Sequence, residues 1–105
     1  MGSSSALGVL AEPSRREILD LLRGGEQSVG DLVGHLRISQ PAVSKHLRIL
    51  KEAGLVDARA DAQRRLYRIN PGPLEELDDW LAPYRGFWSA RLDDLESHLD
   101  QRRKR

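Results

Sequence analysis

The stretch SQPAVSKHLRILKEAGLV, residues 39–56, decides the fold of this 105-residue chain. At about 100° per residue, Val43, Leu47 and Leu50 fall on one side of a helix. The helix is expected to begin after Ser39, whose hydroxyl can accept a backbone hydrogen bond, and to end at Gly54. The other side and its leading edge carry polar residues and a proline: Gln40, Pro41, Ser44, Lys45, Arg48 and Lys51. The apolar side must be buried, so the question is what the polar side faces.

Two shorter helices are predicted before this stretch. In EPSRREILDLLRGG, residues 12–25, a capping-box pattern pairs Ser14 with Glu17. In SVGDLVGHLRI, residues 28–38, Ser28 and Asp31 repeat that start signal before apolar residues at helical spacing. Only a tight turn separates the second helix from the third. Two helices joined in this way, the second with a polar N-terminal half, form a helix-turn-helix.

A β-hairpin is predicted directly after the third helix. The segment LVDARADAQRRLYRI, residues 55–69, alternates apolar and polar residues, although its turn, Asp61-Ala62-Gln63, lacks an Asn-Gly or Asp-Gly pair. The hairpin carries four arginines: Arg59, Arg64, Arg65 and Arg68. A helix-turn-helix with a basic hairpin is a winged helix, and the hairpin can meet the backbone or minor groove of DNA.

The C-terminal third predicts a dimer interface. Apolar residues recur every three or four positions from Leu74, and Pro83 should break the helix after about Ala82, before a second helix to about residue 101. That second helix is longer than a thin core can cover, so we expect its stripe to meet a second copy of the chain. The alternative is that the helix folds back within one chain. The expected dimerisation residues are Tyr84, Trp88, Leu92, Leu95 and Leu99.

The whole chain is thus predicted to be one mainly α domain with a small β-hairpin. We expect a single winged helix-turn-helix domain over residues 1–105, with the helix-turn-helix at about 28–54, the wing at about 55–69, dimerisation helices at about 73–101 and a basic tail at 102–105. No stretch has the length of a membrane span or a secretory signal, so we expect a cytoplasmic protein.

Charge is unevenly distributed along the chain. The net charge is +1, but residues 14–68 hold 11 basic and 7 acidic side chains, and residues 69–101 hold 2 basic and 8 acidic ones. An anionic partner would therefore meet the middle of the chain. Glutamine can pair with adenine, and arginine or lysine with guanine, so the polar side of the third helix suits the major groove. The same pattern describes many solvated surface helices, and the neighbouring helix and hairpin favour the DNA-binding interpretation.

The segments LAEPSRREILDLLRGGE, SVGDLVGHLRISQPAVSKHLRILKEAGLV and RRLYRIN resemble the winged-helix repressors of the ArsR/SmtB family over nearly the whole chain. The resemblance implies a homodimeric transcriptional regulator, usually a repressor, that binds a palindromic site on double-stranded DNA. By position it implies that the groove-facing residues are Ser39, Gln40, Ser44, Lys45 and Arg48, and that the wing contacts include Arg59, Arg64 and Arg65. His46 matches the family's histidine but projects beside the apolar face, and we interpret it as a packing residue.

No cofactor or metal is expected. Many members of that family sense metals through thiolates, but this chain has no cysteine, and Ser28 and Gly30 stand where a Cys-Val-Cys motif would place sulfur. A second family site uses Asp and His of the C-terminal helices; Asp94 and His98 have that spacing, but a tetrahedral site needs further ligands. The effector therefore stays unknown.

Two alternatives to an unregulated repressor remain. The basic face could dock an acidic protein instead of DNA. A small apolar ligand could bind among Trp80, Tyr84, Phe87 and Trp88, although core or dimer packing is the simpler interpretation of these aromatics. Enzymatic activity is not expected, because the sequence has no phosphate loop, metal-ligand cluster or nucleophile–base pair that can be placed together.

Overall fold

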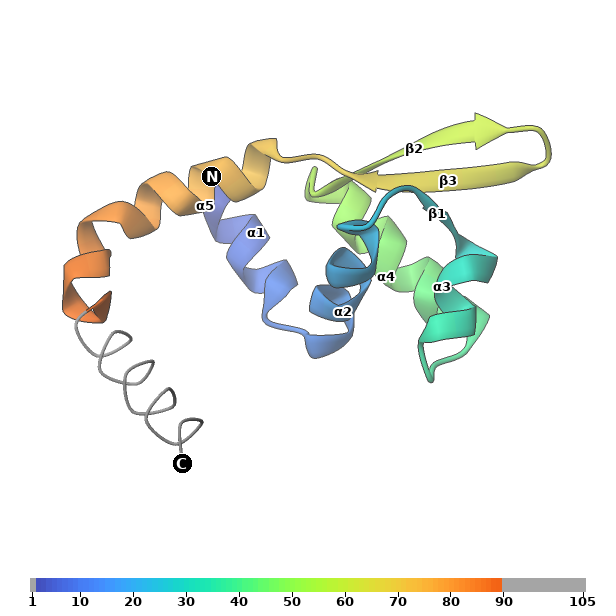
Figure 1. Ribbon diagram of the computed structural model, residues 1–105, viewed down its shortest axis with the longest axis horizontal. Helices are drawn as coiled ribbons and strands as arrows, with labels where there is room; N and C mark the ends of the chain where they lie inside the picture. The colour runs from blue at the N-terminus through green and yellow to red at the C-terminus, as the bar shows by residue number, and fades with distance from the viewer. Residues whose placement is uncertain (1, 90–105) are drawn as a thin grey trace, which may run out of the picture.

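The computed structural model describes residues 2–89, and over this range the chain is a winged helix (Figure 1). The predicted dimerisation residues Leu92, Leu95 and Leu99, the pair Asp94 and His98, and the basic tail lie outside the described residues. The elements are α1 (Gly2–Leu10), α2 (Pro13–Leu22), β1 (Gln27–Ser28), α3 (Val29–His35), α4 (Gln40–Glu52), β2 (Val56–Asp61), β3 (Arg64–Ile69), α5 (Gly72–Leu81) and the 3-10 helix η1 (Ala82–Phe87).

The core lies where α2, α3 and α4 meet the base of the hairpin. Its fully buried side chains include Ile18, Leu32, Leu47 and Leu50, one apolar stripe from each of the three helices. Val56 extends this core into the first residue of β2. Because such side chains are packed on all sides, truncating Leu47 to alanine should cost about 2–5 kcal/mol of stability.

The sheet has three antiparallel strands in the order β1-β3-β2. The hairpin pairs Val56 with Ile69 at its base and Asp61 with Arg64 at its tip, which leaves a two-residue loop. Ala62 in that loop has φ 56°, a left-handed conformation that alanine adopts at some cost. The hairpin prediction is thus confirmed, and the two residues of β1, which the sequence pattern did not predict, pair with β3.

The capping box predicted at Ser14 and Glu17 is wrong. Helix α2 begins at Pro13, and its cap is Glu12, whose carboxylate accepts a hydrogen bond from the backbone N–H of Ser14 at 3.4 Å. Proline suits this first position because it has no N–H to satisfy. An acidic cap before Pro13 therefore replaces the serine cap that the sequence suggested.

Helix α1 was not predicted, because two glycines and a run of serines give residues 2–10 little intrinsic helix preference. The helix packs against α5, so the first and last described helices lie side by side (Figure 1). Ala6 is fully buried in α1. Tertiary packing rather than local preference therefore holds this helix.

The break predicted near Pro83 is confirmed. Helix α5 ends at Leu81, and the chain continues through Pro83 as the 3-10 helix η1 up to Phe87. Proline lacks the N–H that would continue the α-helical ladder, and it clashes with the preceding turn. The chain therefore changes direction here, and the acidic α5 extends away from the helix-turn-helix (Figure 1).

Candidate nucleic-acid interface

Helix α4 is set at both ends by its own sequence. The hydroxyl of Ser39 accepts a hydrogen bond from the N–H of Ala42 at 3.3 Å, and Pro41 occupies the first turn. At the other end Gly54 takes φ 77°, a conformation that favours glycine and stops the helix. Both predicted ends are confirmed. The burial of Val43 and Leu47 fixes the rotation of the helix about its axis.

The outer face of α4 is polar and open to solvent. Four exposed side chains stand on it: Gln40, Ser44, Lys45 and Arg48. Ser39 is also exposed, but its oxygen already serves the cap. These residues present two positive charges, an amide and hydroxyls from the N-terminal half of one helix. That set can read base edges and hold phosphates.

Helix α3, the first helix of the helix-turn-helix, begins with a complete capping box. The Ser28 hydroxyl accepts from the Asp31 N–H at 3.1 Å, and the Asp31 carboxylate accepts from the Ser28 N–H at 3.0 Å. The hydrogen bond from the Ser28 N–H to the carboxylate, aided by the Ser28 hydroxyl, lowers the pKa of Asp31 below its ordinary value. Ser28 is only 8 % exposed, although its strand neighbour Gln27 is more open. The start of the helix-turn-helix is therefore rigidly fixed to the sheet.

The wing carries its arginines on the two long strands, and all four are exposed. Arg59 on β2 donates two hydrogen bonds to Glu26, from Nε at 2.7 Å and from Nη2 at 2.9 Å. Arg64 lies 3.5 Å from Asp61 across the turn. Arg65 and Arg68 make no ion pair with any residue in the range 2–89. The four arginines are thus not equivalent as contacts for an anion.

His46 lies on α4 between the buried and exposed faces, as its sequence position suggested. Its Nδ1 is 3.4 Å from Nη1 of Arg15 on α2, and Nε of Arg15 donates to the carbonyl of Val9 at 2.7 Å. His35, at the end of α3, contacts the Asp31 carbonyl through Nδ1 at 2.8 Å and is exposed. The contact to Arg15 was not predicted, because residues 31 positions apart give no local signal.

Comparison with known proteins places the chain in a family. A sequence model described as bacterial regulatory protein, arsR family, matches residues 12–58. The chain is 39% identical over 72 residues to the transcriptional repressor SdpR of Bacillus subtilis, a match that covers 69% of this chain and 80% of that protein. It is 44% identical over 91 residues to the HTH-type transcriptional regulator Rv2034 of Mycobacterium tuberculosis, covering 87% of this chain and 82% of that protein. The chain belongs to the ArsR family.

Solved structures agree with this assignment. The crystal structure of a possible transcriptional regulator for arsenical resistance superposes with a TM-score of 0.67 at 44% identity, covering 88% of this chain and 93% of that one. An ArsR-like transcriptional regulator from Rhodococcus sp. RHA1 gives a TM-score of 0.72 at 28% identity, covering 91% of each chain. The expected winged helix-turn-helix of the ArsR family is confirmed.

The positions where the resemblance would place the thiolates of an ArsR-family metal sensor have other surroundings here. Ser28 caps α3 through its hydroxyl, and a side chain added at Gly30 would meet that same hydroxyl at 3.7 Å. Among residues 2–89, no group of three or more His, Cys, Asp or Glu residues is arranged to hold a metal ion. In that same range, no helix is both long and apolar enough to cross a membrane.

Trp80, Tyr84 and Phe87 of this ArsR-family protein form an exposed ladder rather than part of the core. The rings of Trp80 and Tyr84 lie 5.2 Å apart and those of Tyr84 and Phe87 6.3 Å apart. Phe87 is 78 % exposed, whereas Trp88 is partly buried. Packing among residues 2–89 therefore does not account for Trp80, Tyr84 and Phe87.

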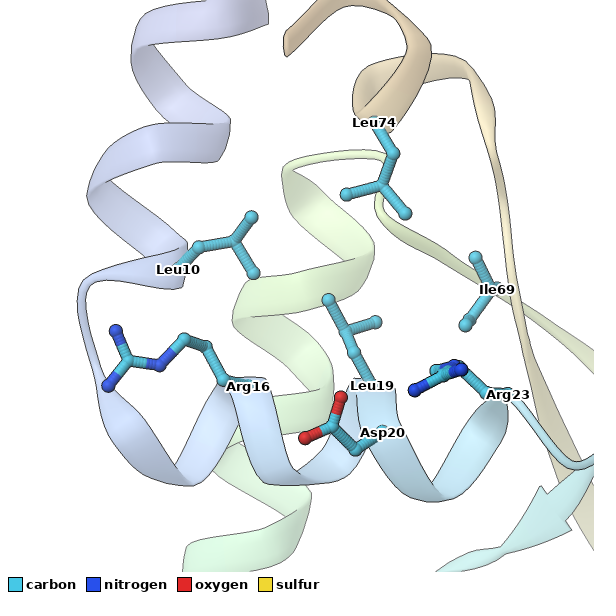
Figure 2. A pocket seen from close by; sticks show the side chains of 7 residues that line it. All are labelled: Leu10, Arg16, Leu19, Asp20, Arg23, Ile69 and Leu74. Atoms are coloured by element: carbon cyan, nitrogen blue, oxygen red, sulfur yellow. The ribbon is translucent and has the colours of Figure 1, made fainter. Parts of the chain in front are cut away.

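A cavity of about 350 Å³ lies between α1, α2, the end of β3 and the start of α5 (Figure 2). Its apolar wall brings together one side chain from each of these elements: Leu10, Leu19, Ile69 and Leu74. Arg16 and Asp20 line it from α2, and Arg23 lines it from the residue directly after that helix. The ladder residues Trp80, Tyr84 and Phe87 do not line it, so the aromatics that the sequence offered for a ligand stand apart from this cavity.

Proposed function

We propose that this ArsR-family protein is a homodimeric transcriptional repressor that binds a palindromic operator on double-stranded DNA. Helix α4 enters the major groove, and the wing lies on the backbone or in the minor groove. The observation that carries the proposal is the solvent-open polar face of α4, held on a capped helix-turn-helix beside an arginine-bearing hairpin. The functions of the two relatives, a transcriptional repressor and an HTH-type transcriptional regulator, support it. The protein acts in the cytoplasm, on its own promoter or others.

The groove-facing residues in this proposal are Ser39, Gln40, Ser44, Lys45 and Arg48. A helix of 13 residues is about 20 Å long and fits the major groove with its N-terminal half toward the base edges. Arg64 and Arg65 stand beside Ser28 and Gly30 around a cavity of about 290 Å³. A phosphate bound near that cavity would lie beside these two arginines of β3.

The dimer in this proposal uses the exposed ladder on α5 and η1 together with Trp88 and the more distal Leu92, Leu95 and Leu99. Large aromatic side chains are strongly favoured at protein interfaces because they bury much apolar area with few rotatable bonds. A second copy related by a two-fold axis would set two α4 helices about 34 Å apart, the spacing of successive major grooves. The acidic α5 would then lie away from the DNA and repel it.

The direct experiment is footprinting on the promoter region of the gene itself, followed by selection of bound duplexes from a random pool. A palindromic protected site with half-sites one helical turn apart supports the proposal. If the protein binds duplex DNA no better than any other polyanion and leaves no sequence-dependent footprint, the winged helix is a protein-interaction module that docks an acidic partner. The pool also yields the operator sequence.

A second candidate, regulation by a small ligand, rests on the cavity of Figure 2. Its volume lies in the range of small-molecule pockets, and it lies between α5 and the end of β3, the returning strand of the wing. Because arginines line the cavity beside its apolar wall, apolar acids are the candidate ligands. Repeating the selection of bound duplexes in their presence tests this function. Filling the cavity with Leu74→Trp should make DNA binding insensitive to any acid that releases the wild-type protein.

A further inference from the structure

A two-pronged ion pair crosses the wing. Arg59 on β2 donates from Nε and Nη2 to the two carboxylate oxygens of Glu26, at 2.7 Å and 2.9 Å. Glu26 directly precedes β1, and β3 lies between β1 and β2 in the sheet (Figure 1). The pair therefore links the segment that leads into α3 to the outer strand of the wing.

Glu26 stands in a positive environment. Pairing of Gln27 with Tyr67 puts Glu26 next to Arg68 in register, and strand alternation puts Arg59 on the same face of the sheet. Hydrogen bonding to Arg59, aided by the charges of Arg59 and Arg68, lowers the pKa of Glu26 below its ordinary value. The carboxylate is thus ionised at neutral pH, and it neutralises one of the wing's arginines.

The same guanidinium fork that binds a carboxylate also binds a phosphate. Both anions accept two parallel N–H hydrogen bonds in one plane, so the Nε–Nη2 edge of Arg59 is closed to a phosphate while it holds Glu26. Arg59 keeps half of its side-chain surface exposed, and Glu26 keeps 30% of its own exposed, so solvent and DNA can reach the pair. By contrast, Arg65 on β3 has no ion pair with any residue that the structure describes.

We propose that Glu26 competes with a DNA phosphate for the guanidinium of Arg59 and thereby limits how tightly the protein holds DNA. This inference rests on the proposed function and adds to it a residue that opposes binding. In the free protein the pair secures the wing to the segment before α3. On DNA, Arg59 must leave Glu26 before its Nε–Nη2 edge can bind a phosphate, so that two-pronged contact is made only in exchange for another.

The variant Glu26→Gln tests the competition. It keeps the size of the side chain and removes the charge that holds the fork. In the variant, Arg59 is free to make one phosphate contact that Glu26 opposes in the wild type. Such a contact steepens the dependence of log K on log salt by about 0.9 and tightens binding roughly fivefold or more at ~0.1 M salt. Fluorescence anisotropy with a labelled duplex, at several salt concentrations, measures both quantities.

Asp57→Asn is the matched control. It removes the same charge from the same sheet, but the structure shows no hydrogen bond between Asp57 and Arg59. We expect less than a twofold change and an unaltered salt slope. In an Arg59→Gln background, Glu26→Gln should then change binding no more than Asp57→Asn does.

Two results would overturn the inference. Equal effects of Glu26→Gln and Asp57→Asn would mean that Glu26 acts only through net charge. Weaker binding by Glu26→Gln, with an unchanged thermal midpoint, would mean that the pair holds the wing in its DNA-binding position. Failure of the proposed function looks different, because the wild-type protein would then show no sequence-dependent footprint, while the salt slopes on any duplex would still compare the variants.

Discussion

Arg15 and His46 join α4 to α2: Nη1 of Arg15 lies 3.4 Å from Nδ1 of His46. The same guanidinium reaches the carbonyl of Val9 at the end of α1. One side chain on α2 thus contacts both α1 and α4. Because α1 packs against α5, which carries part of the proposed dimer surface, this contact lies on the structural route between that surface and the proposed DNA reader.

Replacing Arg15 with Gln should lower the free energy of unfolding by about 1 kcal/mol, the typical contribution of a lost hydrogen bond. Urea denaturation measures the change. Arg16→Gln is the matched control, since the Arg16 side chain makes no hydrogen bond with any residue in the described range. Equal losses in both variants would show that the contact from Arg15 to His46 and Val9 does not stabilise the fold.

Removing the cap of α3 by Ser28→Ala should cost about 0.5–2 kcal/mol. Asp31 should make this cost depend on pH. Its pKa is lowered in the folded protein, so the capping box stabilises the fold fully above the ordinary aspartate pKa and loses that contribution as the pH falls below ~4. Thermal denaturation between pH 7 and 3 should show a smaller acid-induced loss for Asp31→Asn than for the wild type.

On α4, Arg48→Gln should weaken binding to the selected operator by on the order of 1–3 kcal/mol and relax the preference at one base pair. Gln40→Ala should behave in the same way at a different position. Lys51→Gln, in the last turn of the same helix, serves as the control and should change affinity without changing base preference. If all three lose affinity equally on every sequence, none of them reads a base.

On the wing, Arg64→Gln and Arg65→Gln should each weaken binding to every duplex by the same factor. Each should also flatten the dependence of log K on log salt by about 0.9. Titrations of the operator and of a scrambled duplex at several salt concentrations provide the comparison. A loss confined to the operator would instead make the wing a base-reading element.

The proposed dimer uses the exposed ladder, so Phe87→Glu should shift the protein to monomer in sedimentation velocity at micromolar concentration. A charge placed in an apolar interface must be desolvated without a partner, which weakens association by several kcal/mol. Glu75→Gln on α5 is a control at an exposed, acidic position. A wild-type protein that sediments as a monomer at this concentration would contradict the dimer itself.

The parts of the fold that could be predicted from the sequence are those with a local signal. Ser39 sets the start of α4 through a hydrogen bond, and Gly54 sets its end through a backbone conformation. Pro83 ends α5 in a similarly local way. Helix α1 and strand β1 exist only because distant segments pack or pair with them. Ser14 imitates a cap, but Glu12, two residues earlier, takes that place.

The candidate site divides in the same way. Periodicity predicts that Gln40, Ser44, Lys45 and Arg48 share an exposed face, and the described side chains are exposed. Neither the partner of Arg59 nor that of His46 could be predicted, because Glu26 and Arg15 lie 33 and 31 positions away. Such contacts depend on sheet register and helix packing, which no short stretch of sequence specifies.

The left-handed Ala62 at the tip of the wing has a consequence for the order of folding. A turn built on asparagine and glycine can nucleate a hairpin, whereas one that forces alanine to positive φ opposes its own formation. We therefore expect the strands to close from the base, where Val56 pairs with Ile69, toward the tip. The wing then reaches its final shape only after the helices it extends from have assembled. Amide hydrogen exchange should accordingly be slowest at the base of the hairpin and fastest beside Ala62.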